Sequence, residues 1–380
     1  MYRYTPKNEI LNIKYLILLP ACLLDKMETK DFFALLPREL WEKIILLLLL
    51  SDKFNFLCAL YGNKRVYKRV EKNPKALVWK RDTRWENDSK YIKYILIHHS
   101  VTSIGFKSFG LRSSLTSIII PPSVTSISRC TFYGCSSLTS VTIPEGVTNI
   151  GKGAFYGCSS LTSVTIPKGV TIIGDEAFEC CSSLISATIP EGVTSIGARA
   201  FSNCKSLTSV TIPEGVTSIG INAFSKCKSL TSVTIPNSVT KIGYEVFKEC
   251  TSLTSVTIPE GVTSIGKSAF YNCYDLTSIT IPEGVTSIEG GVFEGCSGLI
   301  SITIPDSVTK IGYGVFYNCS SLTSITIPDR VTSIELGAFE GCTSLTSVTI
   351  PEGVTGIELG TFKKCSGLTS VTIPEGVTSY

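Results

Sequence analysis

The stretch that decides the fold is LTSVTIPEGVTSIGKSAFYNC, from Leu253 to Cys273. Closely similar sequences recur every 23 residues on either side of it. Twelve prolines between Pro121 and Pro374 keep this step. Eleven phenylalanines between Phe132 and Phe362 keep it too, as do eleven cysteines between Cys135 and Cys365. The rest of the chain is an N-terminal segment that precedes the repeats.

A period of 20 to 29 residues built on Leu, Val and Ile indicates a leucine-rich-repeat solenoid. The sequence therefore predicts a parallel β array of about twelve turns of 23 residues. Each turn supplies seven core positions, which in one turn are Leu138, Val141, Ile143, Val147, Ile150, Phe155 and Cys158.

The order of residues within a turn predicts its local structure. Leu-x-x-Val-x-Ile alternates and is rich in β-branched residues, which favours a strand. Pro144 ends this strand because proline cannot donate to a ladder. We expect Glu145-Gly146 to form a bend in which Gly adopts positive φ, and Val147-x-x-Ile150 to be extended again. Residues 151–158 are expected to close the turn as a short helical piece.

The outward strand positions hardly vary along the chain. One is serine in every turn from Ser117 to Ser370, and the other is threonine in every turn from Thr142 on. A protein-binding surface usually carries aromatic or Arg anchors. Either the repeats have duplicated recently, which we favour, or this surface binds something periodic. Variety lies beside the phenylalanine, where we place the candidate partner-binding residues Tyr244, Tyr271, Tyr313, Leu336 and Leu359. The alternative, which we slightly favour, is that this variety is neutral drift at exposed loop sites.

Composition argues against several other classes of site. The repeated cysteines alternate with apolar positions, so we expect a ladder of reduced, buried thiols. No CxxC pair exists and His98 and His99 are the only histidines, so no metal site is expected. Residues 1–90 hold 18 Lys+Arg against 11 Asp+Glu, and the remainder holds 17 against 20. This balance lacks the dense positive charge of a nucleic-acid surface.

The repeat L-x-x-V-x-I-P-x-x-V-x-x-I-x-x-x-x-F-x-x-C closely resembles the BspA-type (Treponema-type) leucine-rich repeats over residues 91–380. The resemblance implies a curved, right-handed solenoid that binds proteins. Members of that family include adhesins on bacteria and repeat proteins in protists and large DNA viruses.

Residues 31–80 predict a small all-α unit that resembles an F-box. The features that match are the motif Leu36-Pro37-x-Glu39-Leu40, a second predicted helix from Asp52 to Leu60, and a basic third segment. The resemblance implies docking to a Skp-type adaptor and a cullin–RING ubiquitin ligase. The implied contact residues are Leu36, Pro37, Leu40, Ile44 and Ile45. The alternative is a helical cap on the solenoid.

Two further segments complete the predicted organisation. Residues 1–30 are an extension or a misassigned start, although the apolar run Tyr15 to Leu24 could also be a signal-peptide core. That run is too short to span a bilayer. Residues 81–113 are a linker with an atypical first repeat, and residues 114–380 are the solenoid proper.

Two classes of function remain. The main hypothesis is a cytoplasmic F-box adaptor (in the host cell if virus-encoded) that recruits an unknown target to the ligase. The alternative is a secreted or surface-exposed BspA-like adhesin, or a scaffold with no ligase link. No catalytic residue set and no cofactor motif is present, so we expect no enzyme. The many free thiols favour a reducing compartment.

Overall fold

The structure is a computed structural model that describes residues 76–79, 92–375 and 377–379. The chain divides into two compact units at Val78. Of the first, only part of strand β1 (Ala76–Trp79) is described. The predicted F-box-like domain, with Leu36, Pro37, Leu40, Ile44 and Ile45, lies outside the described residues.

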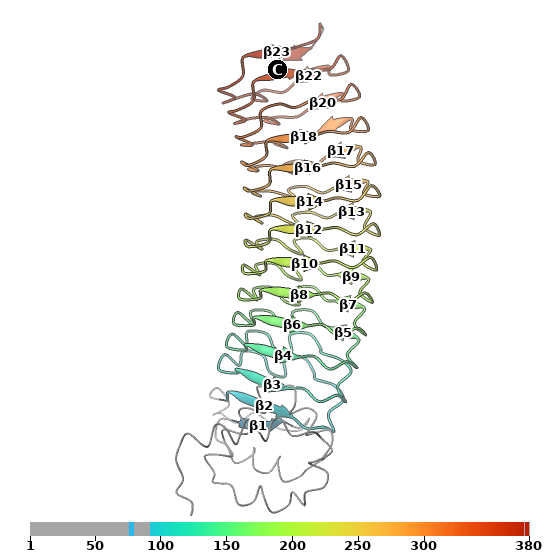
Figure 1. Ribbon diagram of the computed structural model, residues 1–380, viewed down its shortest axis with the longest axis vertical. Helices are drawn as coiled ribbons and strands as arrows, with labels where there is room; N and C mark the ends of the chain where they lie inside the picture. Colours follow the sequence, from blue (N-terminus) through green and yellow to red (C-terminus); the bar gives the residue numbers. More distant parts are fainter. Residues whose placement is uncertain (1–75, 80–91, 376, 380) are drawn as a thin grey trace, which may run out of the picture. The chain divides into compact units, whose positions relative to one another are not determined.

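The second unit is a parallel β solenoid, in which short strands stack turn upon turn (Figure 1). Its first sheet is formed by three- and four-residue strands, in the order β2 (Tyr94–Ile97), β3 (Ser117–Ile119), β4 (Ser140–Thr142), β6 (Ser163–Thr165), β8 (Ser186–Thr188), β10 (Ser209–Thr211), β12 (Ser232–Thr234) and β14 (Ser255–Thr257). The stack continues with the pairs β16 (Ser278–Thr280) with β18 (Ser301–Thr303), and β21 (Ser347–Thr349) with β23 (Ser370–Thr372).

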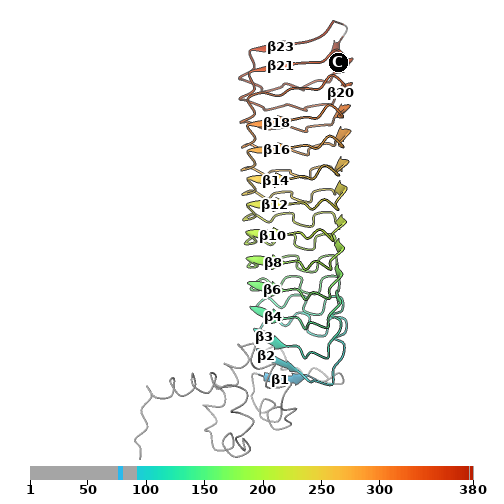
Figure 2. The same ribbon diagram turned by 45° about the vertical axis from the view of Figure 1, so that its right-hand side comes forward.

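A second, narrower stack is made of two-residue strands (Figure 2). Its first part contains β5 (Asn149–Ile150), β7 (Ile172–Ile173), β9 (Ser195–Ile196) and β11 (Ser218–Ile219). Its second part contains β13 (Lys241–Ile242), β15 (Ser264–Ile265), β17 (Ser287–Ile288), β19 (Lys310–Ile311), β20 (Ser333–Ile334), β22 (Gly356–Ile357) and β24 (Thr378–Ser379). The solenoid of about twelve turns is thus confirmed, and no described residue is helical.

The register of the first sheet follows the sequence period, since Ser209 pairs with Ser232 and Val210 with Val233. The three-residue strands from β4 to β21 alternate exposed, buried and exposed side chains, as β10 does. The predicted core positions are all buried, from Leu138 to Cys158 in the third turn. The alternation of the sequence therefore assigns the faces correctly.

A continuous stack of phenylalanine rings fills the core. From Phe109 to Phe362, successive ring centroids lie between 5.1 and 5.8 Å apart. This separation is within the range in which aromatic pairs attract one another beyond the burial of their area. The stack makes each turn depend on its neighbours for a complete core.

The bend after each strand differs from the prediction. The N–H of Val147 donates to the carbonyl of Pro144 at 3.0 Å, and the bond recurs at the equivalent positions from Val101 to Val354. The bend glycines are absent from the residues with positive φ. Close contact with the preceding turn favours glycine in some turns, since a Cβ on Gly284 would lie 2.9 Å from the carbonyl oxygen of Val262. Other turns carry Ser238, Ser307 and Arg330 at this position.

The predicted short helical piece at 151–158 is wrong. Gly153 and Gly157 have positive φ, and the same two positions hold Glu176 and Cys180 in the next turn. The amides of Gly153, Phe155 and Gly157 donate to the following turn instead of closing helical bonds. Because alternate amides point along the solenoid axis, the segment is a series of tight turns.

Candidate binding surface

One column of residues lies two positions after the second strand of each turn, as Lys152 does after β5 and Tyr244 after β13, where the chain leaves the narrower stack. We call it the edge column. It recurs every 23 residues and contains Phe106, Arg129, Lys152, Asp175, Ala198, Ile221, Tyr244, Lys267, Gly290, Tyr313, Leu336 and Leu359. Six of these side chains are large, apolar and exposed, so the column holds half of the exposed large hydrophobics described in the chain.

The last three members form an apolar row. Tyr313, Leu336 and Leu359 occupy successive turns and expose 54%, 43% and 76% of their surface. Strands of neighbouring turns lie about 4.8 Å apart, so such side chains can form one continuous patch. Apolar groups that are contiguous and exposed mark an interaction surface more reliably than scattered ones.

The residue before the edge column explains how this row is held. Most turns carry glycine there, because a Cβ on Gly151 would lie 2.7 Å from the backbone nitrogen of Arg129 in the preceding turn. Three turns carry Glu289, Glu335 and Glu358 instead. In these three turns a glutamate side chain occupies the position at which the turns with glycine pack backbone against backbone.

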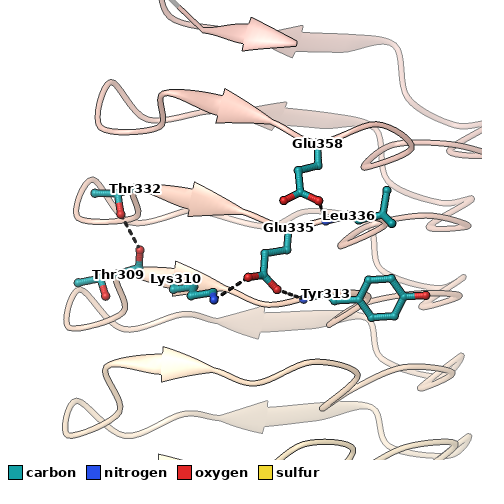
Figure 3. Close-up of polar contacts among 7 residues, drawn as sticks. All are labelled: Thr309, Lys310, Tyr313, Thr332, Glu335, Leu336 and Glu358. Atoms are coloured by element: carbon teal, nitrogen blue, oxygen red, sulfur yellow. Dashed lines mark hydrogen bonds and ion pairs between the residues drawn. The ribbon is translucent and has the colours of Figure 1, made fainter. Parts of the chain in front are cut away.

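Two of these carboxylates bond to the apolar row (Figure 3). The Tyr313 N–H donates to Glu335 Oε2 at 2.9 Å, and the Leu336 N–H donates to Glu358 Oε2 at 2.9 Å. Lys310 Nζ also lies 2.6 Å from Glu335 Oε1. The glutamates therefore fix the backbone from which Tyr313 and Leu336 project, and a fixed surface loses less entropy on binding.

Four of the five candidates from the sequence lie in this column, and Tyr271 does not. Tyr271 follows Phe270 by one residue and is half-buried. Lys248 Nζ lies 5.3 Å from the centroid of its ring. The prediction missed Phe106 and Ile221, which share the edge column and are exposed. Counting the 23-residue register through those positions would have found both.

The basic end of the edge column carries an aromatic cluster. Lys107 Nζ and Arg129 Cζ lie 5.5 and 5.9 Å from the Phe106 ring centroid. Tyr133 stacks on Tyr156 with ring centroids 4.8 Å apart. Cations over aromatic faces attract the rings electrostatically, so the cluster is held together without being buried.

The sheet face offers no comparable anchors. Its outward Ser and Thr side chains are exposed in every three-residue strand from β4 to β21. The threonines beside them bond to the preceding turn, as Thr254 Oγ1 does to the carbonyl of Thr231 at 3.0 Å. The threonine before the narrower stack does the same, as Thr332 does to Thr309 (Figure 3). The hydroxyls of Thr254, Thr332 and their equivalents therefore bond neighbouring turns to one another.

The repeated cysteines are buried from Cys135 to Cys342, and Cys365 in the last turn is partly buried. Each of the eleven thiols donates to the carbonyl of the phenylalanine 26 residues earlier, at 3.1 to 3.3 Å. Burial raises the pKa of Cys135, Cys296 and Cys342 to about 12. The thiolate is the reactive form, so these thiols are poor nucleophiles in any compartment.

The described residues hold no group of three or more His, Cys, Asp or Glu side chains arranged to bind a metal ion. Nor does that part of the chain contain a helix long and apolar enough to cross a membrane.

The repeats match the family described as "BspA type Leucine rich repeat region" in six copies, over residues 85–207, 171–300 and 263–380. The chain belongs to the BspA-type leucine-rich-repeat family. No curated protein matches it.

Solved structures agree with this membership. A leucine-rich repeat protein from Bacteroides ovatus is 33% identical, covers 81% of this chain and 83% of its own, and superposes with a TM-score of 0.73. A leucine rich cell surface protein from Faecalibacterium prausnitzii is 35% identical over 66% of this chain and 83% of its own, with a TM-score of 0.46. The first of these confirms the BspA-type solenoid fold.

Proposed function

We propose that this BspA-type protein binds other proteins through its edge column and performs no catalysis. The observation that carries the proposal is the apolar row of Tyr313, Leu336 and Leu359. It supplies the aromatic and aliphatic anchors that protein interfaces concentrate. The uniform Ser and Thr columns of the sheet supply none.

The test is capture of protein partners by the purified full chain from an extract of the source cells. The double variant Tyr313→Ser with Leu336→Ser should lose the captured proteins. Ile300→Ser is the matched control, since Ile300 is equally exposed but lies outside the edge column. Equal capture by all three proteins would contradict the proposal.

Of the two compartments, we propose the cell surface. The resemblance to BspA-type repeats implies that adhesins are among the family members, and one relative with the same fold comes from a bacterium, Bacteroides ovatus. The free thiols no longer favour the cytoplasm, because buried thiols with raised pKa values resist oxidation. Surface labelling of intact source cells tests this: labelled protein is expected, and protein labelled only after lysis would contradict it.

The ubiquitin-ligase hypothesis depends on Leu36, Pro37, Leu40, Ile44 and Ile45, which the structure does not describe. It has its own test, a pull-down with a Skp-type adaptor that compares the wild type with Leu40→Asp and Ile44→Asp. An adaptor role requires recovery by the wild type and its loss in both variants. No recovery by the wild type would exclude that role.

A further inference from the structure

A basic and aromatic surface lies on the first turns of the solenoid. It consists of Phe106, Lys107, Leu111, Arg129 and Tyr133, and we call it the basic patch. Lys107 Nζ lies 5.5 Å from the Phe106 ring centroid and 5.6 Å from that of Tyr133, so one lysine joins both rings. Arg129 Cζ lies 5.9 Å from the Phe106 ring centroid on the same surface.

Backbone bonds between neighbouring turns hold the basic patch in place. The Lys107 N–H donates to the carbonyl of Arg129 at 3.3 Å, and the Leu111 N–H donates to that of Tyr133 at 2.6 Å. A Cβ on Gly134 would lie 2.9 Å from Leu111 Cδ2, so the leucine side chain covers this glycine, next to Tyr133. Leu111 therefore extends the surface that the two rings and the two cations form.

The apolar members of the basic patch protrude. Phe106 exposes 61% of its surface and Leu111 exposes 69%, and of the large apolar side chains described only Leu359 exposes more than either. Protein interfaces usually enclose their anchors in fitted pockets. Side chains that protrude this far suit a partner that receives them without a fitted pocket, as the interface of a lipid bilayer does.

The charge of the basic patch is not neutralised. Among the described residues, neither Lys107 nor Arg129 has a carboxylate partner, and both are exposed. Residues 92–174 hold a single acid, Glu145, which lies at the bend after the first strand and not at the corner that holds Phe106. The basic patch is therefore complementary to anionic groups.

Charge is distributed unevenly over the whole chain in the same sense. Residues 1–174 hold 24 Lys+Arg against 12 Asp+Glu, whereas residues 175–380 hold 11 against 19. An anionic membrane surface attracts the first part and repels the second. Residues 1–90 have an excess of Lys+Arg themselves, so they do not complement the basic patch as a cover from within the chain.

We propose that the basic patch binds the surface of a membrane that contains anionic lipids. Phe106 and Leu111 enter the boundary between headgroups and acyl chains. Lys107 and Arg129 bind the phosphates at the level of the headgroups, with their aliphatic stems along the apolar side chains. The contact is peripheral. It adds a second ligand to the proteins bound by the apolar row, and it does not rest on that function.

Cosedimentation of the purified full chain with lipid vesicles tests the contact. Vesicles of phosphatidylglycerol and phosphatidylcholine should bind the wild type, and the binding should weaken as the salt concentration rises. Vesicles of phosphatidylcholine alone should bind it more weakly by about tenfold or more. Equal binding to both kinds of vesicle, or to neither, would overturn the proposal.

A charge reversal tests the assignment to the basic patch. Arg129→Glu should weaken binding to the anionic vesicles by about tenfold or more. Lys168→Glu is the matched control, since it changes the net charge equally at an exposed position outside the basic patch. Equal losses would show that net charge alone decides binding. No loss in Arg129→Glu would assign the binding to other residues, and either result would overturn the proposal.

Tryptophan fluorescence tests insertion independently of charge. Phe106→Trp should be quenched by brominated lipids more strongly than the wild type, because its ring enters the acyl boundary. Ile221→Trp should show no such increase, since Ile221 is exposed in the same edge column but lies five turns further along. The same quenching in both variants would contradict insertion through the basic patch.

An acidic protein is the competing partner for the basic patch. In that case the wild type would not bind anionic vesicles, and Arg129→Glu would lose a protein captured from the source-cell extract. This outcome would refute the membrane contact. The double variant Tyr313→Ser with Leu336→Ser leaves the basic patch intact and should still bind vesicles, so this proposal and the proposed function can fail separately.

Discussion

The cysteine at the end of each repeat shows how one residue type can be selected for packing and not for reactivity. Cys296 is fully buried, and its thiol donates to the carbonyl of Phe270 at 3.2 Å. It therefore occupies the volume of a small hydrophobe while satisfying a backbone acceptor. The repeated free cysteines are therefore explained by packing in the core, and they do not indicate whether the protein is in a reducing or an oxidising compartment.

The same thiol makes stability depend on alkaline pH. Burial raises the pKa of Cys296 from 9.0 to about 12. Between these values the unfolded chain has lost a proton that the folded chain keeps, so the free energy of unfolding falls as pH rises. One such thiol contributes at most about 1.4 kcal/mol per pH unit.

Urea denaturation at a series of pH values between 8 and about 11 checks this. Cys296→Ala should show a shallower loss of stability with pH than the wild type, whatever its stability at pH 7. The same pH dependence in both proteins would show that the thiol ionises equally in the folded and unfolded states.

The glycine before the edge column is also required by packing. A Cβ on Gly174 would lie 2.7 Å from the backbone nitrogen of Lys152, whereas a Cβ on Gly261 would meet nothing closer than 3.5 Å. Gly174→Ala should therefore cost about 1 to 3 kcal/mol of stability. Gly261→Ala should cost little, and chemical denaturation of the two variants side by side compares them. Equal losses would refute the close approach of the turns.

Each turn is an element whose backbone is satisfied by its neighbours. The segment between the second strand and the cysteine donates alternate amides to the next turn and closes the others locally. Its positive-φ positions hold Lys226, Glu249, Asn272 and Lys364 as well as glycine. Interturn bonding thus overrides the residues' own preference, which explains why a helical piece was predicted there.

Within the turns of the apolar row, Glu358 replaces backbone packing by a hydrogen bond to the Leu336 N–H. Glu358→Ala should therefore speed amide exchange at Leu336 and cost about 0.5 to 1.5 kcal/mol. Glu358→Gln retains an acceptor and should change both less. Hydrogen exchange followed by NMR measures the amide directly, and an unchanged rate in Glu358→Ala would contradict the role given to the carboxylate.

The whole solenoid has a core that is continuous but uneven. Phe224 and Phe293 are fully buried, whereas Phe362, Cys365, Leu368 and Val371 are only partly buried. Stability in such arrays is roughly a sum over turns and the interfaces between them. A turn with a less complete interface should open more easily.

Hydrogen exchange along the chain measures this difference. Amides in residues 358–372 should exchange faster than those in residues 218–300 when the protein is monomeric. Full protection of residues 358–372 in a monomer would contradict it.

The sequence predicts the solenoid because its period, its alternation and its prolines each depend on local chemistry. Leu138, Val141 and Phe155 are buried where the pattern places them. The positive φ predicted for the bend glycine was wrong, because glycine is favoured both by positive φ and by close contact with a neighbouring turn. The edge column was only partly found, since variation in sequence does not show which variable positions share one side of the molecule.

The edge column, and not the Ser and Thr face, is the binding surface that we propose. Photo-crosslinking tests it most directly, with the same photoreactive amino acid placed at position 336 in one protein and at position 347, on strand β21, in another. We predict crosslinked products to another protein from position 336 and not from position 347. Products from position 347 alone would contradict the account.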